Sequence, residues 1–271
     1  MQSSVPESPF ACYTVLPMAP TELASTAAFA LFAVSYLAFW FFTESDRIKT
    51  SFTARFGQAE SLVRMGPARF VFALAAGLVP ILALPGLSGR PLRDFGLAGA
   101  RTGVAVAAIA AVAAASFAVC FALSFFSRKS PADLEFYPQI KAERWTPGVF
   151  AVEILGWGVY LFAYESAFRG YLPATLMHSG LAFWPTVAVM TSLYVALHIP
   201  KGFKEAALAA PFGVALSLAS LWSGNIWIAF FAHLGLATGN DFGALRTARG
   251  TKPHKSGGVG PYATRDTSKR R

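Results

Sequence analysis

The chain has 271 residues, of which 55% are hydrophobic and only 14% are charged. Soluble domains carry about 25% charged residues, so this composition excludes an ordinary soluble fold and indicates a polytopic membrane protein. The formal net charge of +9 does not indicate nucleic-acid binding, because the basic residues gather in the C-terminal tail and between apolar stretches. We expect a lipid bilayer as the environment and no nucleic acid as a partner.

Seven stretches are apolar over the roughly 20 residues that a membrane-spanning helix needs. The sequence therefore predicts an all-α polytopic membrane protein, a bundle of about seven transmembrane helices with six to eight as the range. The irregular stretches are 68–88, which contains Pro80 and Pro85, and 205–222, which contains Pro211. The seven are residues 24–43, 68–88, 103–126, 149–176, 181–199, 205–222 and 225–243.

A segment flanks each end of this transmembrane domain, which we place at residues 22–245. The N-terminal segment 1–21 has no lysine, no arginine and no short apolar core, so it does not resemble a secretory signal. The tail 246–271 is basic and rich in small polar residues, so we expect it to be disordered. Cys12 and Cys120 are too isolated to build a disulfide framework or a Cys-based zinc site.

The placement of basic residues predicts an orientation. With the N-terminus outside, the inside segments 44–66, 127–147 and 200–204 and the tail carry 18 of the 23 lysines and arginines. The positive-inside rule favours this arrangement and a cytoplasmic tail. Arg90 and Arg93 oppose it, because they share one short outside loop.

Residues 44–66 have the pattern of an amphipathic segment at the membrane surface. Its apolar side chains include Phe52, Phe56 and Leu62. The basic residues that we expect to face lipid headgroups are Arg47, Lys49, Arg55 and Arg64.

Ionisable residues inside the predicted spans need a reason, because a charge at the bilayer centre costs roughly 2.5 to 3.5 kcal/mol or more. From the fourth span onward these residues are Glu153, Glu165, Arg169, His198 and His233. Glu165 and Arg169 are four residues apart and so share one face of a helix. We predict the functional site around this pair, with the two histidines as its partners.

A carboxylate beside a histidine in a low-dielectric cavity can act as a general base that takes a proton from water. A second histidine can donate a hydrogen bond to the oxyanion that forms when water attacks an amide carbonyl. Glu165, His198 and His233 can alternatively bind zinc, although no HExxH pair fixes two ligands on one helix turn.

The order of these motifs resembles the CPBP family, the CAAX protease and bacteriocin-processing family of Rce1-like, glutamic-type intramembrane proteases. Its motifs are EExxxR, then FxxxH, then HxxxN or HxxxD, on successive membrane helices. The corresponding positions here are Tyr164-Glu165-xxx-Arg169, Tyr194-xxx-His198 and His233-xxx-Ala237. The resemblance covers about residues 90–240 and includes Pro91 to Leu97, which is similar to a loop found upstream in this family.

The resemblance implies an intramembrane endopeptidase that uses neither a cofactor nor a metal. Glu165 would be the base, His198 its partner and His233 an oxyanion donor, and Arg169 would orient the carboxylate. The implied substrate is the membrane-proximal end of a membrane protein, or a lipidated or leader-bearing peptide. The implied location is the bacterial inner (cytoplasmic) membrane.

Two positions depart from the family. Tyr164 replaces the first glutamate, which is credited with activating water, and Ala237 replaces the last Asn or Asp. A tyrosine with a pKa of about 10 is a poor base at neutral pH. A second hypothesis is therefore a catalytically inactive scaffold or immunity protein that binds a partner's transmembrane segment. A transporter is a third, because intramembrane Glu, Arg and His also build proton relays.

Other carboxylates are poorly placed to replace the missing glutamate. Glu153 shares the helix face of Tyr164 but lies roughly 16 Å away along the axis. Glu165 is rotated by about 100° from Tyr164 on an ideal helix, so it can serve only where the helix is turned or distorted. Gly170 and Pro173 are the candidate places for such a distortion.

Depth in the membrane raises a further question. Glu165 lies about 16 residues into its span and His198 about 17 into the next, antiparallel one. Two straight, full spans would put them on opposite sides, so we expect one helix to be shifted, tilted or broken, with Pro185 as a further candidate place. Asn240 and Asp241, about two turns after His233, are additional polar groups that can reach a cavity.

Overall fold

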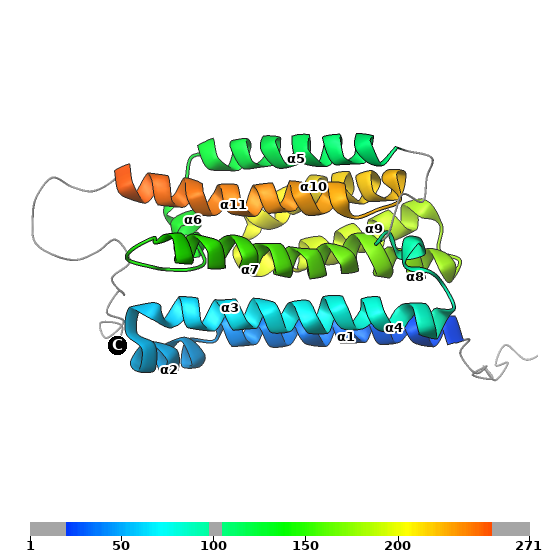
Figure 1. Cartoon of the computed structure of the whole chain (residues 1–271), viewed down its shortest axis with the longest axis horizontal. Helices are drawn as coiled ribbons and strands as arrows, with labels where there is room; N and C mark the ends of the chain where they lie inside the picture. The colour runs from blue at the N-terminus through cyan, green and yellow to red at the C-terminus, as the bar shows by residue number, and fades with distance from the viewer. Residues whose placement is uncertain (1–19, 98–104, 251–271) are drawn as a thin grey trace, which may run out of the picture.

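The structure is a computed structural model that describes residues 20–97 and 105–250 (Figure 1). Every regular element in these two ranges is helical, which confirms the all-α fold class. Cys12, most of the N-terminal segment and the tail beyond Gly250 lie outside the described residues.

The helices follow the predicted stretches closely. The first half of the chain forms α1 (Pro20–Glu44), α2 (Asp46–Phe56), η1 (Gly57–Ala59), α3 (Glu60–Phe72), η2 (Ala73–Leu78), α4 (Val79–Ser88), η3 (Leu92–Phe95) and α5 (Val106–Phe126). The second half forms α6 (Pro131–Phe136), α7 (Pro147–Glu165), η4 (Ser166–Tyr171), α8 (Leu172–His178), α9 (Phe183–Ala196), η5 (Ile199–Lys201), α10 (Phe203–Ser223) and α11 (Trp227–Gly250). Both η2 and η4 are π-helical.

Six helical runs in the described residues are long and apolar enough to cross a membrane. The seventh predicted stretch, 225–243, forms α11, a 24-residue helix that packs along α5. Because α11 continues to Gly250, residues 246–250 of the expected disordered tail are helical. The chain is an integral membrane protein with a polytopic helical bundle.

The bundle is layered around α7 (Figure 1). On one side, α7 contacts α3 and η2, which lie beside α1. On the other side α7 contacts α11, and α5 covers α11 as the outermost helix. The pair α9 and α10 closes the region around η4, which α10 contacts directly. The helix α7 and the turn η4 are thus packed against other helices on several sides.

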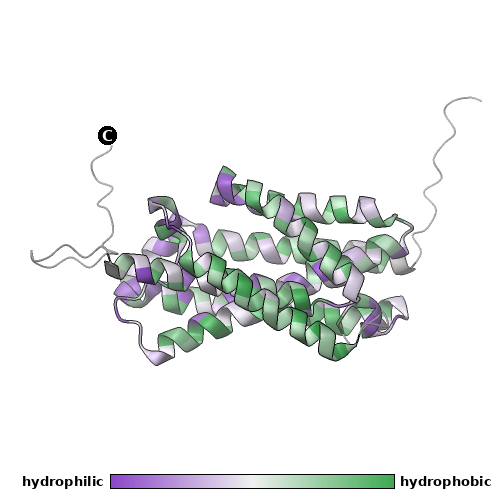
Figure 2. Ribbon diagram, turned by 90° about the horizontal axis from the view of Figure 1, so that it is seen from above, coloured by the Kyte–Doolittle hydropathy of each residue, from purple (hydrophilic) through white to green (hydrophobic). Residues whose placement is uncertain are grey.

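Polar residues concentrate at the two ends of the bundle and apolar ones along its length (Figure 2). The helices α2 and α6 and the C-terminal end of α11 lie at one end of the bundle (Figure 1). These are the segments that the charge distribution predicts to be inside. Their common location agrees with that grouping, and the side of the membrane stays a prediction.

Pro80 is accommodated by a side chain from the middle of the bundle. Proline has no N–H to donate to the carbonyl four residues earlier, which here belongs to Ala76. The Tyr171 hydroxyl donates to that Ala76 oxygen at 2.8 Å. The π-helical turn η2 and this hydrogen bond let the helix continue through the proline, so 68–88 is one continuous span.

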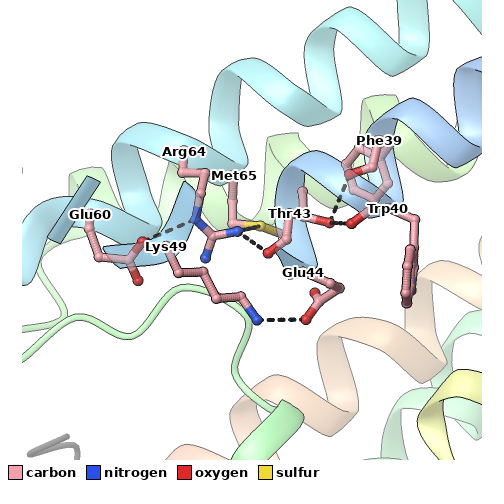
Figure 3. Close-up of polar contacts among 8 residues, drawn as sticks. All are labelled: Phe39, Trp40, Thr43, Glu44, Lys49, Glu60, Arg64 and Met65. Carbon is pink, nitrogen blue, oxygen red and sulfur yellow. Dashed lines mark hydrogen bonds and ion pairs between the residues drawn. The ribbon is translucent and has the colours of Figure 1, made fainter. Parts of the chain in front are cut away.

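Arg64 occupies a different place from the one we predicted (Figure 3). It is buried and does not face headgroups: it donates to the carbonyl oxygen of Thr43 and pairs with Glu60 at 3.0 Å. Thr43 lies in the last turn of α1, where carbonyls lack helical partners. Arg64 therefore fastens α3 to the end of α1, while α2 has no buried residue and keeps its predicted surface character.

A row of three glycines brings α11 against α5. A Cβ added at Gly235, Gly239 or Gly243 would lie 2.4 to 2.8 Å from a backbone carbonyl oxygen of α5, that of Phe117, Phe121 or Phe125. Real side chains do not approach so closely. Small residues spaced by four allow this kind of helix contact in membranes.

We expect Gly239→Ala to lower the free energy of unfolding by about 1–3 kcal/mol, because its Cβ would meet rigid backbone 2.6 Å away. Gly158→Ala in α7 is the matched control, since a Cβ there meets nothing within 4 Å. Thermal unfolding of both variants in the same detergent measures the difference. Equal stability of the two variants would contradict the close packing of α5 on α11.

Candidate active site

The Glu165–Arg169 pair lies where α7 passes into the π-helical turn η4. Glu165 is the last residue of α7, and Arg169 lies inside η4. The expected distortion is therefore present, and it begins immediately after the carboxylate. Gly170 allows a close contact at this turn, because a Cβ there would lie 2.7 Å from the carbonyl oxygen of Phe95. The loop that contains Phe95 thus packs directly on the distorted turn.

Glu165 binds one residue with each of its two oxygens. Its Oε1 lies 2.5 Å from His233 Nδ1, and its Oε2 lies 3.6 Å from Arg169 Nε. Glu165 is completely buried. A carboxylate held in this way fixes the His233 ring with Nδ1 as the donor, so the opposite nitrogen, Nε2, is free to act as a base.

Arg169 is also held by aromatic faces. Its guanidinium carbon lies 5.1 Å from the centre of the Tyr194 ring and 5.7 Å from that of Phe168. Such cation–π contacts stabilise a cation that is removed from water. Sequence reasoning assigned Tyr194 only to a motif position. In the structure it lies next to several residues of the site.

His198 lies at about the same depth as Glu165, so the placement on opposite sides that two straight, full spans implied does not occur. Glu165 is 13 residues before His178, the end of α8, and His198 is 15 residues after Phe183, the start of α9. At 1.5 Å per residue the two distances are about 20 and 22 Å. The prediction measured both residues from the starts of their spans and overlooked that antiparallel helices meet at their shared turn.

The two histidines line one cavity of about 200 Å³. His198 Nδ1 donates to the carbonyl oxygen of Tyr194 at 2.8 Å, which leaves its Nε2 as an acceptor. The Tyr194 ring centre lies 4.5 Å from the His198 ring and 6.0 Å from the His233 ring. The lining of the cavity also includes three charged residues, Glu44, Lys201 and Glu205, whose end of the cavity we call its mouth.

Tyr164 and Ala237, the two departures from the family motifs, also line this cavity. The Tyr164 ring lies 5.8 Å from that of His233, and its buried hydroxyl has no hydrogen-bond partner among the described residues. Glu165 is not among the lining residues. The cavity wall therefore offers two imidazoles and, beside His233, the phenol of Tyr164, with the carboxylate of Glu165 behind His233.

The zinc alternative finds no matching arrangement in the described part of the chain. No group of three or more His, Cys, Asp or Glu side chains is positioned there to hold a metal ion. Glu165 is directed to His233 and Arg169, whereas the nearest polar contact of His198 is a backbone carbonyl.

A second buried ionic cluster lies on the same helix. Arg69 of α3 pairs with Glu153 at 2.9 Å and lies 4.5 Å from the ring centre of Trp157. Trp157 donates to Asp241 at 2.5 Å. Sequence reasoning missed Arg69, although a lone arginine in the apolar stretch 68–88 was a signal. Glu153 and Asp241 are thus engaged here and not at the site of Glu165.

Asn240, the other polar residue considered after His233, does not line this cavity but a neighbouring one. Its Oδ1 accepts a hydrogen bond from Lys129 Nζ at 2.6 Å. Burial lowers the pKa of Lys129. Asn240 therefore stabilises a partly buried ammonium group and does not take the place of the family's Asn.

We expect Glu165→Ala to lower the free energy of unfolding by about 3–5 kcal/mol, because it leaves Arg169 as an uncompensated buried charge. Glu44→Ala removes an exposed partner of Lys49 and should change stability little. Thermal unfolding in detergent measures both. A Glu165→Ala variant as stable as Glu44→Ala would contradict a charged, buried pair.

The comparisons with known proteins agree with the motifs. Residues 145–238 match the family model described as type II CAAX prenyl endopeptidase Rce1-like. The match spans α7 to α11 and leaves out the loop at Pro91 to Leu97. No curated protein and no solved structure matches the chain. The chain is thus an integral membrane protein whose residues 145–238 are similar to the Rce1-like family, and this match is consistent with a CPBP family member.

Proposed function

We propose that the protein is an intramembrane endopeptidase of the CPBP type, which hydrolyses a peptide bond with activated water. The observation that carries the proposal is one cavity lined by His198, His233 and Tyr164, with Glu165 and Arg169 buried behind it. These groups supply a base, a positioning carboxylate and a hydrogen-bond donor without any cofactor.

His233 and Glu165 together make the base. His233 Nε2 accepts a proton from water, and the imidazolium that forms is stabilised by Glu165 at Nδ1. Arg169 holds the carboxylate in place. The base function expected of Glu165 is in this way exerted through His233, since Glu165 itself does not line the cavity.

Tyr164 and His198 complete the reaction. His198 Nε2 accepts a hydrogen bond from the other O–H of the water and so orients the attack of the water on the carbonyl carbon. The Tyr164 hydroxyl donates to the carbonyl oxygen as it becomes an oxyanion. When the C–N bond breaks, His233 returns its proton to the leaving amine. The phenol thus acts as a donor, because a tyrosine hydroxyl keeps its proton at neutral pH.

The cavity suggests the kind of substrate. Eight of its 20 lining residues are aromatic, and its charged lining residues are Glu44, Lys201 and Glu205. A membrane-proximal segment of another protein, or a lipidated or leader-bearing peptide, has the matching combination of an apolar stretch and a polar end. We place the mouth and the basic tail on the cytoplasmic side of a bacterial inner membrane, as the distribution of basic residues predicts.

A second candidate function is a catalytically inactive scaffold or immunity protein. Tyr164 and Ala237 favour it, because both stand in the cavity where the family has polar catalytic groups. In that case the same cavity would bind a partner's transmembrane segment without cleaving it.

Alanine variants of Glu165, His198 and His233 test the two functions. We expect each to reduce cleavage of a co-expressed membrane substrate by at least 100-fold, because each removes a group that the proposed reaction uses. His178→Ala is the control, since His178 bonds Arg90 at the far end of α8. Undiminished cleavage by all three variants would reject this site. A wild type that binds a membrane partner without cleaving it would support the scaffold.

Tyr164→Phe tests the donor role of the phenol. Removing one oxyanion donor lowers kcat by about 100-fold or more. Tyr160→Phe is the matched control, because Tyr160 lines the same cavity and stacks on Tyr164 at 5.9 Å. Both variants are compared by cleavage rate in the membrane fraction. Equal rates for the two would remove Tyr164 from the mechanism.

A further inference from the structure

The neighbouring cavity that Asn240 lines lies between the ends of α5, α10 and α11, beside α6. Its volume is about 360 Å³, which falls in the range of about 300–1,000 Å³ that is usual for ligand cavities. It shares four lining residues with the cavity of the candidate active site: Tyr137, His198, Glu205 and Leu236. The wall that carries His198 therefore separates the candidate active site from a second space that can hold a ligand of its own.

Three cations line this second cavity where two membrane spans end. Arg128 and Lys129 closely follow α5, whose span ends at Phe126. Lys204 is the second residue of α10 and stands at the start of the span Phe203–Ser223. The ends of spans lie at the level of the lipid headgroups. The three cations are thus at the depth where a phospholipid carries its phosphate.

The cations of this cavity are not balanced by its carboxylates. Two carboxylates, Asp133 and Glu205, are among the lining residues, so three cations leave an excess of one positive charge. Lys204 pairs with Asp133 at 3.4 Å. Arg128 and Lys129 form no ion pair with any other residue in the described part of the chain. The lining therefore favours a ligand with one negative charge.

Lys129 is the most enclosed of the three cations. Its Nζ donates to Asn240 Oδ1 at 2.6 Å and, at 2.8 Å each, to Ser127 Oγ and the Ser124 carbonyl oxygen. All three acceptors are neutral. Burial lowers the pKa of Lys129, and the charge of Lys204 lowers it further, although neighbouring carboxylates raise it in part. An anion beside Lys129 would stabilise the charged form of this ammonium group.

The apolar part of the lining lies deeper in the membrane than the cations. Leu208 and Phe212 follow Lys204 at intervals of four residues, so the three side chains lie along one face of α10. Leu123 lies in the last turn of α5, before the two cations that follow this helix. Leu123 and Leu208 are 69% and 58% exposed. The lining thus passes from cations at headgroup level to apolar side chains that acyl chains can reach.

We propose that this cavity binds an anionic phospholipid, with its phosphate at Arg128, Lys129 and Lys204 and an acyl chain along Leu123 and Leu208. A phosphoglycerol headgroup carries one negative charge and balances the excess positive charge of the lining. Phosphatidylcholine has no net charge and leaves that excess in place. Basic pockets between membrane helices bind acidic headgroups for the same reason. The lipid site stands on its own lining and does not depend on the proposed function.

Titration of the purified full chain in detergent with dioleoyl phosphatidylglycerol tests the site. At about five times its Kd, this lipid should raise the unfolding temperature by about 2–4 °C more than dioleoyl phosphatidylcholine does. Glycerol 3-phosphate should have no effect, because it has the phosphate without the acyl chains. Equal shifts with the two lipids would overturn the proposal. A shift with glycerol 3-phosphate as large as that with the lipid would also overturn it.

A double variant, Arg128→Gln with Lys204→Gln, locates the lipid. It should lose most of the lipid-dependent shift, while Lys129 stays in place because it also holds the end of α5. The matched control is Arg47→Gln with Arg55→Gln, which removes the same charge from the exposed helix α2 and should keep the shift. Equal loss in both double variants would mean a general attraction of acidic lipid to basic surface and overturn the site.

An acidic peptide distinguishes the lipid from a protein segment. Hexaglutamate carries negative charge but no apolar chain for the groove, so it should not raise the unfolding temperature. Stabilisation by hexaglutamate and not by phosphatidylglycerol would assign the cavity to an acidic protein segment and overturn the lipid site.

Discussion

The organising constraint of this molecule is that every charge inside the bilayer must be compensated. Two buried cations, Arg69 and Arg169, meet two carboxylates of one helix, Glu153 and Glu165. The carboxylates are 12 residues apart on α7, about 18 Å along its axis. Each pair is linked to a residue of α11. The Arg69–Glu153 pair is linked through Trp157 to Asp241, and Glu165 bonds His233 directly. Charge compensation thereby makes α7 the centre of the bundle and fixes the depth of α11.

The same constraint applies to the backbone. Where the helical hydrogen-bond pattern is interrupted, a side chain replaces the missing donor: Tyr171 at the carbonyl before Pro80 and Arg64 at the end of α1. Tyr171 belongs to η4, the turn that also carries Arg169. The helix around Pro80 and the candidate active site are therefore linked through Tyr171. A change near Pro80 would disturb η4 without touching any proposed catalytic group.

The sequence predicted the helices well, because a span of about 20 apolar residues has few alternatives in a bilayer. It also predicted that Glu165, Arg169 and His233 belong together. The relative orientation of these side chains could not be predicted. The π-helical turn rotates the residues after Glu165, and the geometry of an ideal helix does not describe that rotation. Arg69 was missed since its partner lies 84 residues away, and only the packed bundle brings the two together. The glycine row of α11 was visible in the sequence, but nothing there indicated that α5 would be its partner.

The replacement at position 164 changes the charge balance of the site as well as its chemistry. The family motif has two glutamates and one arginine, so a neutral cluster requires a proton on one carboxyl group. Here one glutamate faces one arginine, and the cluster is balanced without that proton. Glu165 pairs with Arg169 and hydrogen-bonds to His233, and in the proposed mechanism this makes the carboxylate a positioning group and gives the base function to the imidazole. The departure from the motif thus agrees with the proposed mechanism, in which histidine, and not glutamate, takes the proton from water.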